Sequence, residues 1–358
     1  MKETTNRRKA RAVRVGGTLI GGNAPITVQT MTNTDTHDVR ATLAQVEALV
    51  GAGADIIRLA VPDLSAAATF TAIKKAGVRV PLVADVHFDH RIALAAIAAG
   101  ADKIRINPGN IGSRDKVAEV VRACRAAGVP IRIGVNSGSL EKSILEKHGH
   151  PSAAALAESA LYHARILEEL DFYDTVLSVK ASSVPEMIEA NRILADATDY
   201  PLHLGVTEAG GARVGTVKGA VGIGSCLAAG IGDTIRVSLA ADPALEVRVA
   251  RDILSALDLN PARELDIVAC PTCGRTKIDL IPLLSAFEAA LDKTDLRKKP
   301  LKVAFMGCAV NGPGEAREAD IGIAGGVGDA LLFKKGEIIR RIPECEIIST
   351  LIDEIGRM

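Results

Sequence analysis

The residues with the clearest chemical potential are cysteines near the end of the chain. Cys270 and Cys273 form a C-x-x-C pair within CPTCGR, and Cys308 follows in the Gly- and Pro-rich segment GCAVNGPGE at 307–315. Two thiolates at this spacing can bind one metal centre. A third thiolate in a glycine-rich turn can approach the same centre closely. The spacing therefore predicts a metal centre built on these three cysteines.

The number of cysteines indicates which metal is bound. A closed structural zinc site usually takes four Cys or His ligands, whereas a [4Fe–4S] cluster held by three thiolates leaves its fourth iron to another ligand. Glu315 is the nearest carboxylate for that position, and Cys345 is the competing ligand. An iron–sulfur cluster is therefore favoured, with zinc and unligated structural cysteines as alternatives. Cys124 and Cys226 lie in Ala-rich helical patterns and are expected to be small core residues.

A second set of polar residues recurs toward the ends of β-branched runs, spaced by two within each run so that they share a face. The cations of this set are Arg58, Arg105, Arg132, Lys180 and Arg236. The other members are Asp85, His87, Asn107, Asn136, Ser178, Ser182, Glu208 and Ser238. Five cations on one face repel each other and need compensation, and Asp85 and Glu208 supply only two charges. A polyanionic ligand, such as a phosphorylated compound, is therefore predicted, and an internal salt-bridge lattice is the alternative.

The elements that carry these residues alternate between strand and helix patterns. The eight expected strands are 26–31, 55–61, 82–87, 103–107, 131–136, 175–180, 202–207 and 234–238. The helix-like segments between them are 40–52, 65–76, 91–99, 113–127, 151–170, 184–197 and 211–229. This alternation predicts an α/β fold with a closed (β/α)8 barrel of the TIM type rather than an open doubly wound sheet. The polar set would then line the barrel interior and its C-terminal mouth.

The pattern changes after Ala262, which predicts two domains, 1–262 and 263–358. The second contains the cysteine motifs and is expected to be a small α+β domain. Its expected elements are a helix at 279–291, a charged segment at 292–300, a strand leading into 307–315, a short strand at 320–323, a hairpin over 330–342 with its turn at 334–336, and a final helix at 345–355.

Composition narrows the class of protein. The 358 residues are 48% hydrophobic but only 3% aromatic, so the core is expected to consist of Ala, Val, Ile and Leu. Formal net charge is zero, and three tyrosines without tryptophan provide no basic–aromatic surface for nucleic acid. The chain shows no secretory signal or membrane-spanning run, so its six cysteines are expected to be thiols in the reducing cytoplasm. The basic first 13 residues are expected to form a mobile arm, with a contact to a partner or an organellar presequence as alternatives.

Taken together, these motifs resemble the 4-hydroxy-3-methylbut-2-enyl diphosphate synthase family (IspG/GcpE), in its compact two-domain form. The resemblance covers nearly the whole chain. Both cysteine motifs carry it, as do VQTMTNTDT at 28–36, ADVHFD at 84–89, KIRINPGNIG at 103–112, RIGVNSGSL at 132–140 and HLGVTEAG at 203–210. The cysteine pair together with NGPGE is the most specific part.

The resemblance implies an oxidoreductase that opens the ring of 2-C-methyl-D-erythritol 2,4-cyclodiphosphate and eliminates water to give 4-hydroxy-3-methylbut-2-enyl diphosphate. It also implies a [4Fe–4S] cluster held by Cys270, Cys273, Cys308 and Glu315, with electrons from flavodoxin or ferredoxin. The family forms homodimers in which the cluster domain of one subunit covers the barrel of the other.

The resemblance also implies roles for most residues of the polar set. Arg58, Arg105, Arg132, Lys180 and Arg236 would bind the diphosphate. Asp85, Asn107, Asn136 and Ser238 would orient it, and Glu208 is the candidate proton donor beside the cluster ligand Glu315. Alternative roles are a salt bridge from Glu208 to Arg236 or Lys180, a strand-end ion pair for Asp85, and a wall position for His87. The competing functions are a barrel for a phosphorylated or pterin-like substrate with a zinc-bound module, and a nucleic-acid-binding protein with a zinc tail.

Overall fold

The computed structural model describes residues 7–261, 264–308 and 316–358. The chain divides into two compact units, one ending at Asn260 and the other beginning at Pro261. The sequence places the division two residues later, after Ala262. Within the described residues, no helix combines the length and the apolar character needed to cross a membrane.

The first unit is built on eight parallel strands. They pair in the order β8-β7-β6-β5-β4-β3-β10-β9, and an isolated parallel bridge between Leu177 and Leu202 joins the two outer strands into a ring. The strands are β3 (Thr27–Met31), β4 (Ile56–Ala60), β5 (Leu82–Asp85), β6 (Lys103–Ile106), β7 (Ile131–Asn136), β8 (Thr175–Lys180), β9 (His203–Leu204) and β10 (Thr234–Ile235). The predicted eight-stranded α/β barrel is confirmed.

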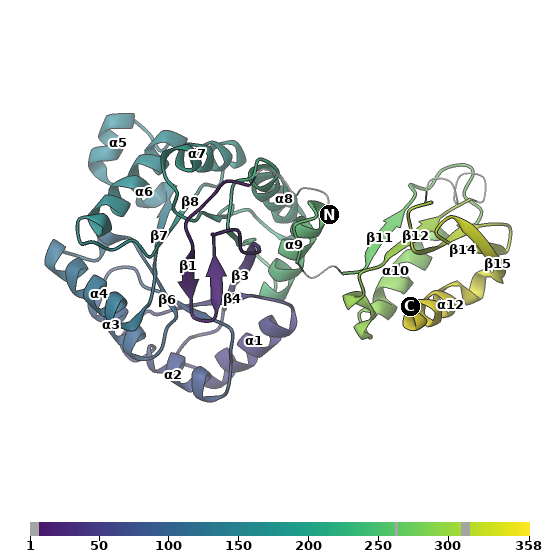
Figure 1. The fold of residues 1–358 in the computed structure, drawn as a ribbon, viewed down its shortest axis with the longest axis horizontal. Coiled ribbons are helices and arrows are strands. Elements are labelled where there is room, and N and C mark those ends of the chain that lie inside the picture. Colours follow the sequence, from purple (N-terminus) through teal and green to yellow (C-terminus); the bar gives the residue numbers. More distant parts are fainter. Residues whose placement is uncertain (1–6, 262–263, 309–315) are drawn as a thin grey trace. The chain divides into compact units, whose positions relative to one another are not determined.

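Helices surround this ring, and Figure 1 shows them outside the strands. They are α1 (Val39–Gly51), α2 (Ala68–Lys75), α3 (His90–Ala98), α4 (Arg114–Ala127), α5 (Lys142–His148), α6 (Ala153–Glu168), α7 (Val184–Ala197), α8 (Ala212–Ala228) and α9 (Pro243–Ala256). Side-chain caps from Asp38, Asp89 and Ser152 fix the starts of α1, α3 and α6. The sequence patterns did not single out α5 and α9.

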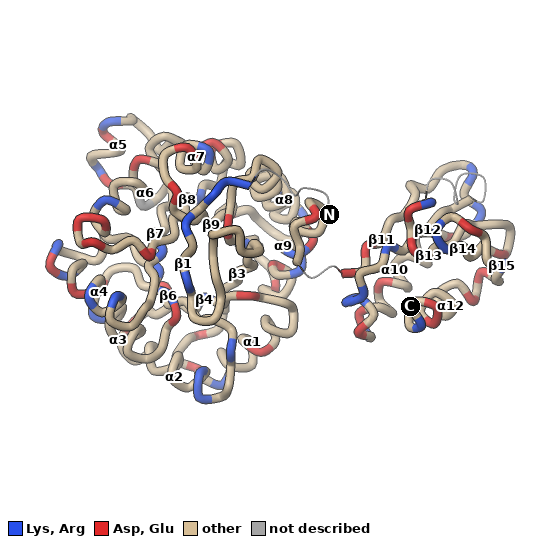
Figure 2. The backbone as a smooth tube through the Cα atoms, in the orientation of Figure 1, with Lys and Arg blue, Asp and Glu red and all other residues tan. Residues whose placement is uncertain are grey.

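The apolar core lies between strands and helices, because alternate strand residues point outward to the helices. Ile57, Leu59, Ile104, Ile133 and Val179 are fully buried there. The intervening residues point into the barrel, which leaves the polar set on the inner face. Basic and acidic residues are interspersed along the outer helices (Figure 2).

A short hairpin that the sequence patterns did not predict lies at one end of the barrel (Figure 1). It consists of β1 (Val13–Val15) and β2 (Thr18–Ile20), paired antiparallel. Its Val15 and Ile20 pack against Ile56 and Val83 in a separate apolar cluster. Ile56 begins β4, and Val83 is near the start of β5, so the hairpin covers the N-terminal end of the barrel.

The described part of the basic N-terminal segment is held against the barrel unit. Arg7 makes an ion pair with Asp233 at 3.0 Å, and Arg8 donates hydrogen bonds to the carbonyl oxygens of Thr198 and Tyr200. The expected mobile arm is therefore wrong for residues 7 to 13. Asp233 directly precedes β10, so these contacts join the segment to the barrel wall.

The second unit contains one five-stranded mixed sheet in the order β11-β12-β13-β14-β15. Its elements are β11 (Asp266–Ala269), α10 (Leu280–Leu291), β12 (Lys302–Met306), β13 (Ile321–Gly325), β14 (Asp329–Lys334), β15 (Glu337–Pro343) and α12 (Ile347–Arg357). Its core includes Phe287 against Phe305, whose ring centroids are 4.9 Å apart. The expected helices and hairpin are present, and β11 is the strand that the patterns missed.

Candidate functional site

A polar cavity of about 210 Å³ opens inside the barrel at the C-terminal ends of the strands. Most of the residues predicted to share this face line it, namely Arg58, Asp85, His87, Arg105, Arg132, Asn136, Ser178, Lys180, Arg236 and Ser238. Gly134 and Thr207 also line it and were not predicted. Residues that are dispersed over the sequence therefore meet at one mouth because each ends a neighbouring strand.

Asp85 is the acid that organises one side of this cavity. Its Oδ1 accepts a hydrogen bond from Nη1 of Arg105 at 3.1 Å, and its Oδ2 lies 3.8 Å from Nε of Arg58. Burial raises the pKa of Asp85, but Arg58, His87 and Arg105 outweigh it and hold the pKa far below its usual range. Asp85 therefore stays ionised and positions two of the predicted cations.

His87 lies on the rim of the same group. Its Nε2 is 3.1 Å from Nη1 of Arg105 and 3.4 Å from Oδ2 of Asp85, while half of its side chain is exposed. Its contacts are those of a wall residue that supports Arg105.

A neutral sulfur atom is a second acceptor in the cavity. Sδ of Met31 accepts hydrogen bonds from Nε and Nη2 of Arg58 at 3.0 and 2.9 Å, and Nη1 of Arg236 lies 3.8 Å from it. Because a thioether carries no charge, Met31 orients these guanidinium groups without neutralising them. Met31 ends β3, and its position two residues after Gln29 is the only sequence signal that could have identified it.

The second acid of the site is Glu246, which the sequence analysis missed. This buried residue of α9 lies 3.5 Å from Nη2 of Arg236 and accepts hydrogen bonds from Thr30 and from the backbone of Leu239. The alternative pairing of Glu208 with Arg236 or Lys180 is wrong within the described residues, because Glu208 makes no salt bridge there. Glu246 lies on a helix after the last barrel strand, and the sequence pattern around it gave no signal that would identify it as a site residue.

Two cations of the cavity have no acid partner. Arg132 and Lys180 make no salt bridge or hydrogen bond to any described residue, although only 1% and 7% of their surfaces are exposed. Burial lowers the pKa of both groups well below the ordinary values, and neighbouring cations lower it further. Burial lowers the pKa of Arg58 to about 10. A salt-bridge lattice therefore accounts for only part of the cluster.

Two glycines make room for these cations. A Cβ on Gly134 would lie 2.5 Å from Nε of Arg105, and a Cβ on Gly205 would lie 2.7 Å from Nζ of Lys180. Both distances are shorter than any real carbon contact. The side chains of Arg105 and Lys180 therefore occupy the space that a larger residue on β7 or after β9 would fill.

A deeper layer of polar residues lies beneath the cavity. Lys103 and His203 are completely buried, and their nitrogens have no hydrogen-bond partner among the described residues. Burial lowers the pKa of both well below the ordinary values, and the charges around them are all positive. The positive charge of the barrel interior therefore extends below the predicted set.

Asn107 and Glu208 do not line the cavity. Asn107 directly follows β6 and is 4% exposed, and both polar atoms of its amide lack partners in the described structure. Glu208 lies four residues after the end of β9, is exposed, and has a φ of 51°. A left-handed backbone at a glutamate is uncommon, and such strain recurs at functional positions.

The cysteines of the second unit lie at the ends of two adjacent parallel strands. Cys270 follows β11 and Cys308 closely follows β12, and the backbone of Cys270 donates to the carbonyl of Phe305 at 3.0 Å. Sγ of Cys270 accepts a hydrogen bond from the backbone N–H of Gly307 at 3.1 Å. Cys270, Cys273 and Cys308 are all free thiols, so they supply the donor atoms that the motif predicts.

The residue expected as fourth ligand lies beyond what the structure describes. Glu315 falls outside the described residues, and within them no three His, Cys, Asp or Glu side chains converge closely enough to bind a metal. Cys345 is an exposed free thiol in the turn before α12. The donor set fits a thiolate-bound cluster by its chemistry and by the hydrogen bond to Cys270.

This fold and this site define a TIM-barrel protein with a cationic mouth and a separate cysteine-bearing domain. Residues 10–251 match the family described as "GcpE TIM-barrel domain", and residues 266–357 match "GcpE protein C-terminal domain". The chain belongs to the GcpE family, as its motifs indicate.

Full-length relatives carry one name, "4-hydroxy-3-methylbut-2-en-1-yl diphosphate synthase (flavodoxin)". The chain is 54% identical to the protein of Halalkalibacterium halodurans over 100% of the chain and 96% of that protein. It is 55% identical to the protein of Geobacillus thermodenitrificans over 100% and 94%. It is 54% identical to the protein of Ruminiclostridium cellulolyticum over the whole of both.

Two solved structures are similar to about 70% of this chain. Type I 3-dehydroquinate dehydratase from Clostridium difficile covers 70% of this chain and 98% of its own, with a TM-score of 0.51 and 14% identity. Dihydropteroate synthase from Xanthomonas albilineans covers 70% and 97%, with a TM-score of 0.50 and 17% identity. At this identity the likeness is one of fold.

Proposed function

We propose that this chain catalyses the reductive ring opening and dehydration of 2-C-methyl-D-erythritol 2,4-cyclodiphosphate to 4-hydroxy-3-methylbut-2-enyl diphosphate, a step of isoprenoid biosynthesis. The observation that carries the proposal is the pair Arg132 and Lys180, two buried cations without an acid in a family of enzymes with this name. A diphosphate supplies the charge that they lack.

The reaction itself explains why the cations outnumber the acids. The cyclic diphosphate takes up two electrons and one proton, a carbon–oxygen bond of the ring breaks, and one water leaves. The opened diphosphate carries one more negative charge than the ring. Cations whose charge is not already neutralised stabilise the state in which that charge develops. Arg132 and Lys180 are the residues that supply this in the barrel, with Arg58, Arg105 and Arg236 held beside them.

Orientation and proton transfer fall to the neutral and acidic groups. Asn136 and Ser238 line the cavity, and Asn107 offers an unpaired amide at the loop after β6. Glu208 is the proposed proton donor, because its exposed carboxyl has no partner among the described residues and follows β9 at the mouth.

Cys270, Cys273, Cys308 and Glu315 would hold a [4Fe–4S] cluster. When bound, the cluster supplies single electrons and a Lewis-acidic iron. Cys273 is suited to thiolate ligation, because backbone and side-chain hydrogen bonds involving Arg275 lower its pKa. Reduced flavodoxin is the proposed electron source, by analogy with the names of the relatives, and ferredoxin is the other candidate.

A homodimer would bring the barrel of one subunit to the cysteine domain of another. An exposed apolar stripe on α8 supports this assembly. Val214, Val217 and Val221 are 45%, 59% and 51% exposed and recur at helical spacing on one face. Val217→Glu is expected to yield a monomer by light scattering and to abolish turnover, and a dimeric, active variant would exclude this stripe from the interface.

Anaerobic purification with iron, acid-labile sulfide and zinc analysis tests the proposal first. About four iron and four sulfide per chain are expected for one cluster of this kind. The same sample should convert the cyclodiphosphate to the open diphosphate when a strong reductant or reduced flavodoxin is supplied. One zinc without sulfide, or no turnover by an iron-replete sample, would contradict the proposal.

A further inference from the structure

A buried histidine outside the barrel interior joins the loops that follow two neighbouring strands. His163 of α6 has a side chain that is 0% exposed, and its Nε2 is hydrogen-bonded to Oε1 of Glu141. Its Nδ1 accepts a hydrogen bond from the backbone N–H of Gly109 at 3.3 Å. Gly109 lies in the 3-10 turn Pro108–Asn110 after β6, and Glu141 follows the turn after β7.

These two contacts define the protonation state of the ring. The backbone N–H of Gly109 can only donate, so Nδ1 of His163 is the acceptor and carries no hydrogen. The single hydrogen of the neutral imidazole therefore lies on Nε2. Nε2 therefore donates to the carboxylate of Glu141. Burial raises the pKa of Glu141, but its hydrogen bonds, that from His163 foremost, together outweigh burial and keep the pKa below the ordinary value. An ionised glutamate thus orients the ring that holds Gly109.

The fit at Gly109 is tight. A Cβ on this residue would lie 2.6 Å from Cε1 of His163, which is closer than any real contact. The turn therefore rests directly on the imidazole. Movement of the ring would move the turn, because no gap lies between them.

The two joined loops carry residues of the proposed substrate site. Asn107 is the residue before the turn Pro108–Asn110, and its buried amide has no partner among the described residues. Asn136 ends β7, five residues before Glu141, and lines the cavity. The chain of contacts from Gly109 through His163 to Glu141 therefore links the loops of two predicted ligand-orienting residues behind the barrel wall.

We propose that His163 and Glu141 form a positioning pair that fixes the loops after β6 and β7 and thereby sets the affinity of the mouth for its diphosphate ligand. Neither residue lines the cavity. The inference rests on the proposed function, since Asn107 and Asn136 are taken to contact the substrate.

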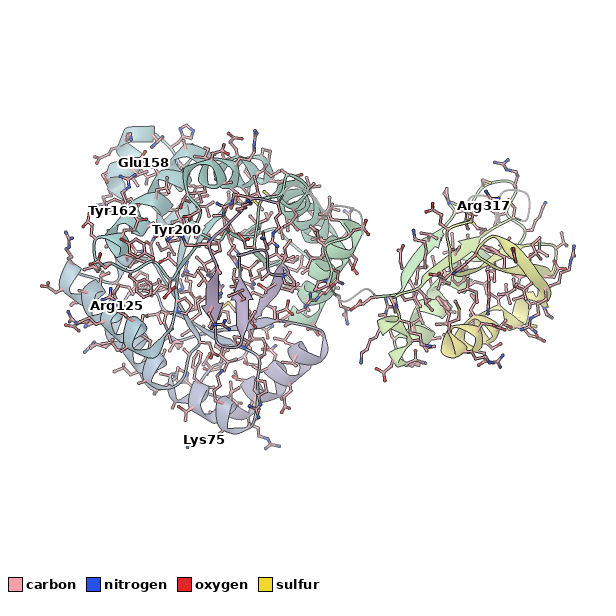
Figure 3. The ribbon with its side chains drawn as sticks, in the orientation of Figure 1. Lys75, Arg125, Glu158, Tyr162, Tyr200 and Arg317 are labelled. Carbon is pink, nitrogen blue, oxygen red and sulfur yellow. The ribbon has the colours of Figure 1, made fainter. Side chains whose placement is uncertain are left out.

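Two conservative substitutions separate the two contacts. The amide nitrogen of glutamine overlays Nε2 of histidine, so His163→Gln keeps the bond to Glu141 and removes the acceptor for Gly109. The amide oxygen of asparagine overlays Nδ1, so His163→Asn keeps the acceptor and removes the bond to Glu141. His148→Gln is the matched control. His148 pairs with Glu158 of α6 at 2.8 Å on the outer side of the same helix, where Figure 3 labels Glu158.

Both steady-state kinetics and hydrogen exchange measured by mass spectrometry are needed, on the iron-replete protein. His163→Gln is expected to raise KM for the cyclodiphosphate about fivefold, the effect of one lost hydrogen bond, with kcat changed less than about twofold. Amide exchange in the peptide spanning residues 104–112 should accelerate. His163→Asn keeps the acceptor for Gly109 but loses the bond to Glu141, so it is expected to raise KM by a similar factor and to accelerate exchange at 137–142 rather than at 104–112. His148→Gln should change neither measurement.

The outcome that overturns the inference is specific. If His163→Gln lowers thermal stability but leaves both KM and exchange at 104–112 unchanged, the pair is only a buried packing contact. Gly109→Ala provides a second route, because its Cβ should displace the turn while His163 stays intact. Failure of the proposed function would look different, because the native protein itself would then not turn over the cyclodiphosphate.

Discussion

The amine of Lys180 lies against the backbone of Gly205, so that a Cβ on this glycine would lie 2.7 Å from Nζ. The same Cβ would lie 2.7 Å from the backbone carbonyl oxygen of Arg236, so Gly205→Ala is expected to push both Lys180 and the backbone after β10 out of position. A loss of one charged hydrogen bond to the diphosphate corresponds to about a tenfold rise in KM. Kinetics of the variant check this. Gly224→Ala on α8, where no atom lies within 4 Å of the added Cβ, is the control and should keep the native KM.

Arg132 is expected to lower the free energy of unfolding of the ligand-free protein and to raise its affinity for the cyclodiphosphate. Arg132→Met removes a buried charge without an acid partner, so the free energy of unfolding of the empty protein is expected to rise by about 1 kcal/mol or more. Affinity for the cyclodiphosphate should fall about tenfold or more. Denaturant titration and calorimetry measure the two effects. Arg192→Met, at an exposed ion pair with Glu189, should alter neither, and a destabilised Arg132→Met would contradict the unpaired charge.

Met31 should contribute to affinity although its side chain carries no charge. Met31→Leu keeps the volume and removes the acceptor for Arg58, so Kd for the cyclodiphosphate is expected to rise about threefold to tenfold. Met187→Leu, a fully buried core substitution, controls for packing. Equal Kd values for Met31→Leu and the native protein would show that Arg58 needs no acceptor there.

The buried Lys103 beneath the cavity is expected to make the protein more stable as pH rises, whereas a lysine in an ion pair makes a protein less stable as pH rises. The folded-state pKa of Lys103 is well below its ordinary value, so between the two values the unfolded chain binds more protons. Stability of the empty protein should therefore increase as pH rises from 7 toward the ordinary lysine pKa of about 10.4.

Lys103→Met should reduce this increase in Tm, measured by differential scanning calorimetry. Lys75→Met, at the exposed lysine of α2 labelled in Figure 3, should retain it. Identical pH profiles for Lys103→Met and the native protein would show that Lys103 does not titrate differently in the folded state.

The ligand set of the cysteine domain can be separated residue by residue. Cys308→Ser is expected to remove most of the iron and sulfide, and Glu315→Ala to leave a labile cluster with little turnover while the oligomeric state is kept. Cys345→Ser should retain full iron content, because Cys270, Cys273, Cys308 and Glu315 already supply the four proposed ligands. Iron and sulfide analysis measures the effect of each substitution. Loss of iron from Cys345→Ser would indicate Cys345, rather than Glu315, as the fourth ligand.

Much of the barrel could be predicted because its strands repeat one sequence pattern. In Arg105 and Asn107, or Arg132 and Asn136, the residue parity both marks the strand and shows which side chains share the inner face. Closure of the ring then brings residues from eight segments together without further information. The cysteine motif was equally local, since two of its thiols lie within four residues.

What the sequence patterns missed depends on tertiary contact. Glu246 enters the site from a helix, where its spacing resembles that of any solvent-facing glutamate, and only the packing of α9 against β3 brings it to Arg236. His163 lies in an Ala-rich helix and is identified only by the loops that close on it. The hairpin of β1 and β2 is too short for a periodic signal, and its role depends on Ile56 and Val83 at the end of the barrel.

The wall of the cavity is not equally stiff on all sides. Strands β7 and β8 have six residues each, whereas β9 and β10 have two each, and a single bridge between Leu177 and Leu202 closes the ring beside them. The short strands lead into Gly205, Thr207, Arg236 and Ser238. The barrel is thus an extensively paired arc joined to a sparsely paired one, and the sparsely paired arc borders the cavity that the proposed function assigns to a compact ring that must become a longer open chain.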